Sequence, residues 1–194
     1  MRTTIFFVSV LILVAIFLPA AVFAQRDYFT PEEVELIRDA QAIDQRIDVL
    51  THAIDRRFAA LKIDVGGKNI TEKEKGQWGE MPTGTRFELL VDVKRILQKA
   101  IDDIDNLSER PDSMIIPEKE DKKAEGYTII FPRAVRNLGA AAKRYQPALK
   151  AELDSTRDGM DKGPILDSLD MCDQIIVAVG KLPTVPAPTT GKKH

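Results

Sequence analysis

Apolar residues recur at alternating steps of three and four along much of this chain. Because an α-helix turns once every 3.6 residues, such spacing collects them into one stripe along a helix. Thr30, Pro31 and Glu33 form a capping pattern that marks where the first such helix begins. The pattern predicts one long helix over residues 31–63, whose stripe is Leu36, Ala40, Ile43, Ile47, Leu50, Ile54, Phe58 and Leu61.

Three further stripes predict three more helices. The second begins after Thr85, where the capping pattern recurs, and the third begins at Pro132. Pro147 lies inside the third helix and is expected to kink it, because proline removes a backbone hydrogen bond. The fourth helix covers residues 164–179 and is capped by Gly180. With no strand-like alternation, the sequence predicts an all-α, antiparallel four-helix bundle of up-down topology.

The N-terminus reads as an export signal over residues 1–24. Arg2 precedes an apolar run, and Val22-Phe23-Ala24 fits a signal-peptidase site, so the mature chain is expected to begin at Gln25. The alternative is an uncleaved membrane anchor, since the apolar run is about long enough to cross a bilayer. Pro19 and the cleavage-like end favour removal. We therefore expect a soluble extracytoplasmic protein, periplasmic or secreted, that contacts the membrane only if this segment is retained.

The mature chain is expected to consist of one helical domain over 25–182 and a disordered tail, rich in Pro and Lys, over 183–194. The whole chain carries 28 Lys and Arg against 30 Asp and Glu. This balance gives no support to nucleic-acid binding. Asn69 and Asn106 begin N-glycosylation sequons, which matter only in a eukaryotic secretory pathway.

The sequence predicts no cofactor and no metal site. Covalent haem needs two cysteines beside a histidine, and Cys172 is the only cysteine. Its thiol either dimerises the protein or is a small buried hydrophobe, and we favour burial. His52 is predicted to face water, because it lies about 150° around the helix from the stripe at Leu50 and Ile54. Glu-x-x-His pairs, which a di-iron centre would need, are absent from the sequence.

Acidic residues spaced three apart, Asp167, Asp170 and Asp173, are either a cation site or a solvated acidic face. An ion site would need more oxygen ligands around a loop, so the solvated face is favoured. No pair of carboxylates stands out as an acid and a base, and we find no nucleophile motif or phosphate-binding glycine loop. The sequence therefore predicts no catalytic residue, and an enzyme is the least supported class.

Two connections are too long to be simple turns. The first covers about 64–84 and carries the only tryptophan, Trp78. This side chain is either an anchor for a partner or a plug for the open end of the bundle, and we favour the plug. The second covers about 109–131 and holds two apolar runs, which either pair as a hairpin or cap one end of the bundle. We favour capping by these runs, Met114-Ile115-Ile116 and Tyr127-Thr128-Ile129-Ile130.

The third helix has a basic face opposite its apolar stripe. Such a face could bind an anionic surface, such as lipid head groups or a wall polymer. Alternatively it pairs with the acidic face of the fourth helix or is simply solvated, and we favour this second interpretation. The residues are Arg133, Arg136, Lys143, Arg144 and Lys150.

These features favour an exported, non-enzymatic helical-bundle protein that binds a partner protein or an anionic component of the cell envelope. The candidate partner-binding residues are Trp78 and Met81 in the first long connection, together with the five basic residues of the third helix. The alternative is an extracytoplasmic carrier or sensor that holds a small molecule in an apolar cavity between helices, where Pro147 would help to open space. Fold class by itself does not decide between them.

Overall fold

A computed structural model describes residues 26–67, 72–110 and 126–182, and these residues form helices and no strand. The all-α class is therefore confirmed. The export signal, the Asn69 sequon and the tail over 183–194 lie outside the described residues. The helices are α2 (Pro31–Asp39), α3 (Ile43–Ala60), α4 (Glu72–Trp78), α5 (Arg86–Glu109), α6 (Tyr127–Ser155) and α7 (Gly159–Gly180).

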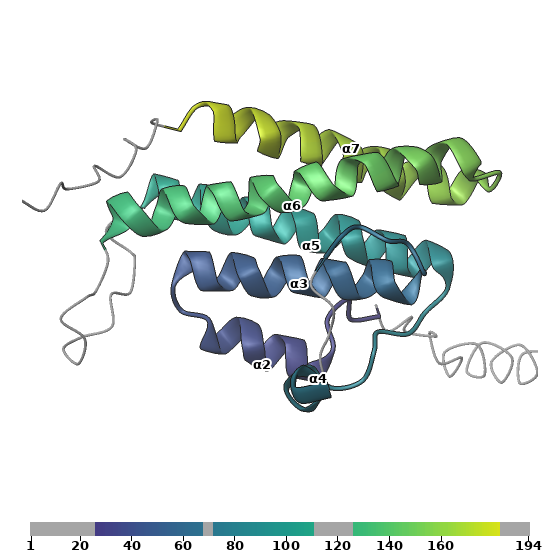
Figure 1. The fold of residues 1–194 in the computed structure, drawn as a ribbon, viewed down its shortest axis with the longest axis horizontal. Helices are drawn as coiled ribbons and strands as arrows, with labels where there is room; N and C mark the ends of the chain where they lie inside the picture. Colours follow the sequence, from purple (N-terminus) through teal and green to yellow (C-terminus); the bar gives the residue numbers. More distant parts are fainter. Residues whose placement is uncertain (1–25, 68–71, 111–125, 183–194) are drawn as a thin grey trace, which may run out of the picture.

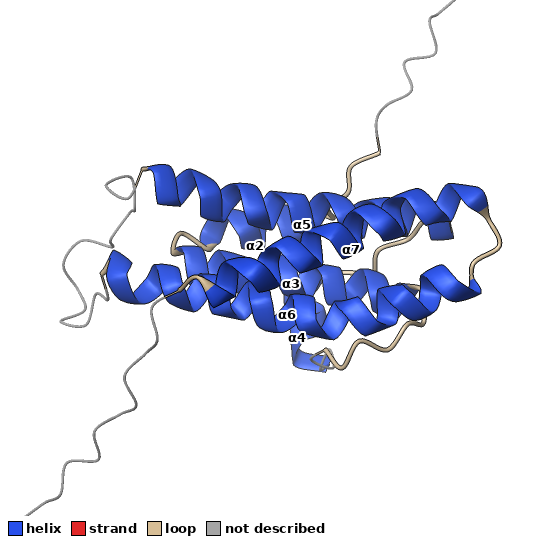
Figure 2. Ribbon diagram, turned by 90° about the horizontal axis from the view of Figure 1, so that it is seen from above, coloured by secondary structure: helices blue, strands red, loops and turns tan. Residues whose placement is uncertain are grey.

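The four longer helices pack around a shared apolar core. α3 and α7 each pack against both α5 and α6, while α5 and α6 touch each other only weakly (Figure 1). α2 folds back along α3 on the side away from α7, and the short α4 packs against α2. Seen from above, the long helices lie alongside one another and α4 lies at the periphery (Figure 2). The core includes Ile47 and Leu50 of the predicted first stripe, together with Leu97 of α5 and Leu138 of α6.

Helices α3 and α6 run in the same direction. Three side-chain pairs between them join residues 89 positions apart: Arg133 with Asp44, Asn137 with Asp48 and Arg144 with Asp55. A constant difference in residue number, rather than a constant sum, is the signature of a parallel pair. α5 and α7 are also parallel, because Arg86 with Asp161 and Lys94 with Asp167 are separated by nearly the same number of residues, 75 and 73. In Figure 1, α3 and α6 run in one direction and α5 and α7 in the other. These contacts differ from the expected bundle, in which every neighbouring pair would be antiparallel.

The single helix predicted over 31–63 is wrong, because α2 ends at Asp39 and α3 begins at Ile43. Residues 38–42 contain neither glycine nor proline, so tertiary contacts set this break. Glu33 lies against Arg56 in the structure. In one continuous helix these two residues would be about 35 Å apart, at 1.5 Å per residue.

Both predicted capping boxes are confirmed, at Thr30 with Glu33 and at Thr85 with Glu88. Other helix limits differ from the prediction. α6 begins at Tyr127, so Pro132 lies inside it and the run Tyr127–Ile130 is helical rather than one strand of a hairpin. The other run, 114–116, lies outside the described residues.

Two more helix limits also differ. α7 begins at Gly159 rather than at Pro164, because Asp158 caps it by accepting a hydrogen bond from the Met160 N–H group. Gly180 is its last helical residue, and Lys181 takes the C-cap position instead. The first long connection contains α4, which the sequence pattern did not reveal.

A buried ion cluster of Glu33, Arg56 and Arg57 joins α2 to α3. The Glu33 side chain is 0% exposed and both arginine side chains are 1% exposed. Arg56 Nη1 donates to Glu33 Oε1 at 2.6 Å, and Arg57 Nη1 donates to the same oxygen. Burial lowers the pKa of the Arg56 guanidinium, and the Glu33 carboxylate opposes that shift. One carboxylate therefore forms ion pairs with two buried guanidinium groups.

Backbone carbonyl groups extend this cluster and tie further segments to it. Arg57 Nη2 donates to the carbonyl oxygen of Tyr28 at 2.6 Å. Arg56 Nη2 donates to the carbonyl oxygen of Glu80, just beyond α4. Because a buried charge is tolerated only when it is paired and hydrogen-bonded, the cluster fixes four segments relative to one another. These segments are α2, α3, the N-terminal residues before α2 and the turn after α4.

Replacing Glu33 with Gln should strongly destabilise the protein. The capping box survives, since Gln serves at this position, but two buried guanidinium groups lose their only shared carboxylate. We expect the free energy of unfolding in urea to fall by about 3–5 kcal/mol. The matched control is Glu35→Gln, which removes an exposed Glu–Arg pair on the same helix and should cost less than about 0.5 kcal/mol. Equal effects from the two variants would contradict a buried cluster.

The contact between α6 and α7 depends on Gly139. A Cβ atom added there would lie 2.3 Å from Val179 Cγ2. Valine is stiff at χ1, so this methyl group cannot swing away without a change in backbone position. The glycine therefore sets how closely the two helices approach.

Replacing Gly139 with Ala should destabilise the protein by about 1 kcal/mol or more, because the overpacking cost exceeds the helix propensity gained. The control is Gly163→Ala in α7, where an added Cβ meets nothing within 4 Å. That variant should be neutral or stabilised. In a thermal-unfolding double-mutant cycle, Val179→Ala should recover part of the loss at Gly139. A stabilised Gly139→Ala protein would refute the close approach.

Candidate functional site

A groove of about 380 Å³ lies between α3 and α6, and it is called the α3–α6 groove below. Its size falls within the range of small-molecule sites. α3 supplies one wall and α6 supplies the other, while α4 contributes one side chain. The lining residues are Asp48, Val49, Thr51, His52, Asp55, Trp78, Asn137, Ala140, Ala141 and Arg144.

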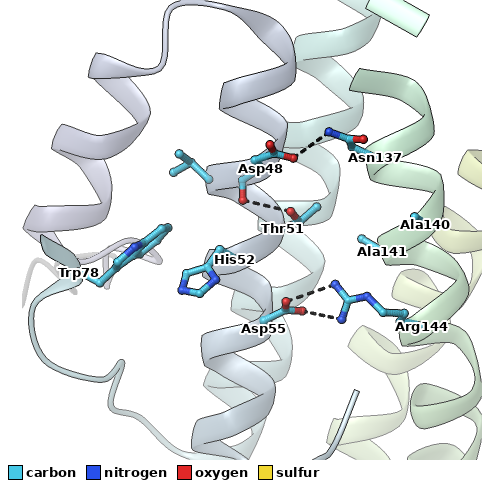
Figure 3. A pocket seen from close by; sticks show the side chains of 10 residues that line it. Asp48, Thr51, His52, Asp55, Trp78, Asn137, Ala140, Ala141 and Arg144 are labelled. Carbon is cyan, nitrogen blue, oxygen red and sulfur yellow. Dashed lines mark hydrogen bonds and ion pairs between the residues drawn. The ribbon is translucent and has the colours of Figure 1, made fainter. Parts of the chain in front are cut away.

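A polar pair stands at each end of the groove (Figure 3). At one end, Asn137 Nδ2 donates to Asp48 Oδ1 at 2.9 Å. At the other, Arg144 donates through both terminal nitrogens to the Asp55 carboxylate, at 3.3 and 3.2 Å. Each helix separates its two polar residues by seven positions, about 10 Å of helix. Because the helices are parallel, the pairs meet in register.

Small or buried side chains line the groove between the two pairs. Ala140 and Ala141 lie between Asn137 and Arg144 on α6 (Figure 3). Their short side chains leave the groove open, and Ala140 is exposed at its mouth. Thr51 and His52 are buried on the α3 side. The groove therefore has charged ends and a weakly polar middle.

The sequence-based prediction that His52 faces water is wrong. The imidazole packs against the indole of Trp78, with ring centroids 4.3 Å apart. The guanidinium of Arg56 lies 5.5 Å from the centre of the Trp78 ring. Trp78 is thus buried between a histidine and a cation, because α4 covers the side of α3 that the helical wheel assigned to solvent. Its ring fills the flank of α3 rather than standing exposed.

The chain after α3 closes the groove at the Arg144 end. Arg144 Nη1 donates to the carbonyl oxygen of Val65 at 3.1 Å. A Cβ atom added at Gly67 would lie 2.5 Å from Asp55 Oδ2, so only glycine lets the backbone pass the carboxylate. Burial alone would lower the pKa of Arg144, but the hydrogen bonds and charge of Asp55, together with Tyr145, outweigh it and raise the pKa. The Arg144 guanidinium is therefore held in its charged form.

The floor of the groove is fixed from behind by Tyr145. Its hydroxyl donates to the carbonyl oxygen of Thr51 at 3.0 Å, and its ring lies 5.1 Å from the Arg144 guanidinium. Burial raises the pKa of Tyr145 well above its ordinary value, so the hydroxyl remains a donor. The polar residues of the groove are thus positioned by buried neighbours.

The structure brings together two of the seven predicted partner-binding residues, Trp78 and Arg144, at this groove. Met81 is 40% exposed and lies on the turn after α4, away from it. Lys143 and Lys150 are exposed on α6, and Arg136 is half-buried. A partner-binding role for the seven residues stays a prediction.

The predicted pairing of the basic face with the acidic face of the fourth helix is wrong for two of its residues. Arg133 Nε pairs with Asp44 Oδ2 at 3.0 Å, and Arg144 pairs with Asp55, both on α3 rather than on α7. The acidic residues of α7 meet other groups: Lys94 of α5 pairs with Asp167 at 2.7 Å. Arg133 and Arg144 of this face therefore join α6 to α3 through ion pairs.

Sequence reasoning missed most of the groove, including Asp48, Asp55 and Asn137. A signal for them exists in retrospect. Aspartates at 44, 48 and 55 have the same spacing as the residues that meet them at 133, 137 and 144. Equal intervals on two helices indicate a parallel contact. Because the sequence-based prediction made neighbouring helices antiparallel, these residues were not compared in that register.

Cys172 is buried in the core, where burial raises the pKa of its thiol to about 12. A thiol so protonated and so enclosed is a poor nucleophile and is not placed to form an intermolecular disulfide. Across the described ranges, no three His, Cys, Asp or Glu side chains gather in a way that could hold a metal ion. Nor is any helix in those ranges both long and apolar enough to cross a membrane.

A second, smaller cleft of about 170 Å³ lies where α5, α6 and α7 meet near the end of α5, and it is called the α5–α7 cleft below. Its lining is mainly apolar, and two polar residues stand among it. The lining residues are Ile101, Ile104, Asp105, Val135, Leu138, Gln174, Ile175 and Ala178.

Comparison of the chain with protein-family models, with curated proteins and with solved structures gives no match.

Proposed function

We propose that this protein is an exported, non-catalytic binding protein, and that the α3–α6 groove holds its ligand. The ligand is a small polar molecule or the exposed unit of a larger component of the cell envelope. One observation carries the proposal: two polar pairs stand in register at opposite ends of an open groove of about 380 Å³. The export part of the proposal rests on the apolar N-terminal segment alone.

Pre-organisation supports a binding role. Arg144 is held by Asp55 and the Val65 carbonyl group, and the floor is held by Tyr145. A ligand that enters such a site spends little free energy on ordering side chains, and this raises affinity. The same mutual pairing speaks against catalysis, because the charged groups already neutralise one another.

We also infer that α3, α5, α6 and α7 form a closed four-helix bundle, with directions that alternate along the chain. The four main packing contacts among these helices, α3 with α5, α5 with α7, α7 with α6 and α6 with α3, make a ring, which supports this inference. In that arrangement the groove lies between two parallel helices, where residues at equal intervals meet as pairs.

A carrier of small apolar molecules is the second candidate, and the α5–α7 cleft favours it. Its volume of about 170 Å³ is close to that of an engineered apolar cavity, about 150 Å³, that binds benzene. Val135 and Leu138 line it on α6, far along the helix from Pro147. The cleft is smaller than the usual range for ligand sites, so this function is the less supported of the two.

Filling the groove at Ala140 tests the proposed function. Ala140 is exposed, so Ala140→Phe should block the groove without loss of stability. The probes are neutral saccharides, amino acids, dipeptides and linear polyamines, each screened by thermal unfolding. A ligand present at 100 times its Kd should stabilise the protein by about 2.7 kcal/mol, and Ala140→Phe should abolish this effect.

The matched control is Ala151→Phe, an exposed alanine of the same helix that lines neither hollow. It should respond to the probe as the unchanged protein does. Ala178→Phe, which fills the α5–α7 cleft instead, should also leave the response intact. Stabilisation lost only in Ala178→Phe, with small apolar probes, would replace the proposed function with the carrier function.

A further inference from the structure

We infer that the α5–α7 cleft binds a small primary amine that carries one compact apolar group. The apolar group enters the cleft, and the ammonium group stays at the rim. This site is separate from the α3–α6 groove, so the inference does not rest on the proposed function. It is carried by the apolar floor of the cleft and by the carboxylate and the amide that stand at its rim.

The floor of the cleft is apolar and enclosed. Ile104 of α5, Leu138 of α6 and Ile175 of α7 all line it, and all three are buried. Because they come from three different helices, the packing of the helices fixes the shape of the floor. An engineered apolar cavity of about 150 Å³ binds benzene. The cleft, at about 170 Å³, therefore has room for one aromatic ring or a branched aliphatic group of similar size.

The rim of the cleft follows from the parallel register of α5 and α7. Lys94 pairs with a residue 73 positions further along the chain. The same difference places Ile101 opposite Gln174. One turn further on, it places Asp105 opposite Ala178, and all four of these residues line the cleft. Because Ala178 is small and exposed, its side chain does not cover the carboxylate that faces it.

The Asp105 carboxylate has no cation beside it. Between the residues that the structure describes, this carboxylate forms no hydrogen bond and no ion pair, and no Lys, Arg or His of theirs lines the cleft. Its exposed acidic neighbours on α5, Asp102 and Glu109, add negative charge. Lys181, one turn beyond Ala178, is exposed and does not pair with Asp105. A negative charge at the mouth of an apolar cleft attracts a cation and repels an acid.

A primary ammonium group matches the hydrogen-bonding groups of the rim. It has three N–H donors and no acceptor. The Asp105 carboxylate accepts from it in a charge-assisted hydrogen bond, which is stronger than a neutral one. The side-chain carbonyl of Gln174 accepts a second N–H, since this amide forms no hydrogen bond with another described residue. An alcohol of the same shape gains no charge-assisted bond of this kind, and a carboxylic acid meets repulsion.

Isothermal titration calorimetry with phenethylamine tests this inference, with phenethyl alcohol and hydrocinnamate as the uncharged and the acidic probe. The unchanged protein should bind the amine at least about tenfold more tightly than the alcohol, the gain from one hydrogen bond to a charged group. It should not bind the acid. Asp105→Asn should lose this preference for the amine. Asp102→Asn, the same change at an exposed position one turn earlier on α5, should keep it.

A second pair of variants tests where the amine binds. Ala178→Phe fills the mouth of the cleft and should abolish binding of phenethylamine. Ala151→Phe, at an exposed position of α6 that does not line the cleft, should bind it as the unchanged protein does. Thermal unfolding of each variant without probe checks that it is folded.

Equal affinity for the amine and the alcohol would overturn the inference and leave the cleft as the apolar site of the carrier function. A preference for the amine that survives Asp105→Asn, or amine binding that survives Ala178→Phe, would also overturn it, as would a protein that binds no amine. None of these outcomes decides the proposed function, because the test of the α3–α6 groove depends on Ala140→Phe.

Discussion

The positions of α2 and of the turn after α4 on α3 depend on one buried carboxylate, that of Glu33. Glu33 lies fully enclosed against two arginines of α3, and those arginines reach the carbonyl groups of Tyr28 and Glu80. An apolar core would form without this cluster, since the helical stripes supply it. The cluster does something that apolar burial cannot do: it is directional, so it fixes where α2 and the turn after α4 lie on α3. Trp78 then covers His52, and the flank of the groove is complete.

The groove itself follows from the parallel packing of α3 and α6. Two helices that run in the same direction bring residues at equal intervals together, so Asp44, Asp48 and Asp55 each meet a polar residue of α6. Two of these pairs bound the groove, and small alanines separate them. In an antiparallel pair the same side chains would meet in reverse order, and the two ends of the groove would not form.

Local signals in the sequence predicted local structure well, and long-range contacts account for the errors. The capping boxes at Thr30 and Thr85 depend on residues three positions apart, and both are confirmed. The apolar stripe of the first helix correctly identified core residues such as Ile47 and Leu50. The break near residue 40, the burial of His52 and the pairing of Arg144 with Asp55 all depend on partners distant in sequence. A helical wheel contains no information about such partners.

The emission of Trp78 tests most directly whether the buried cluster holds α4 against α3. It is the only tryptophan in the chain, so the signal has a single source. Its ring lies between His52 and Arg56 and is almost fully enclosed. A ring so enclosed should give blue-shifted fluorescence that acrylamide quenches weakly in the folded protein. A red-shifted, readily quenched emission under native conditions would contradict it, because the flank of the groove would then be open to water.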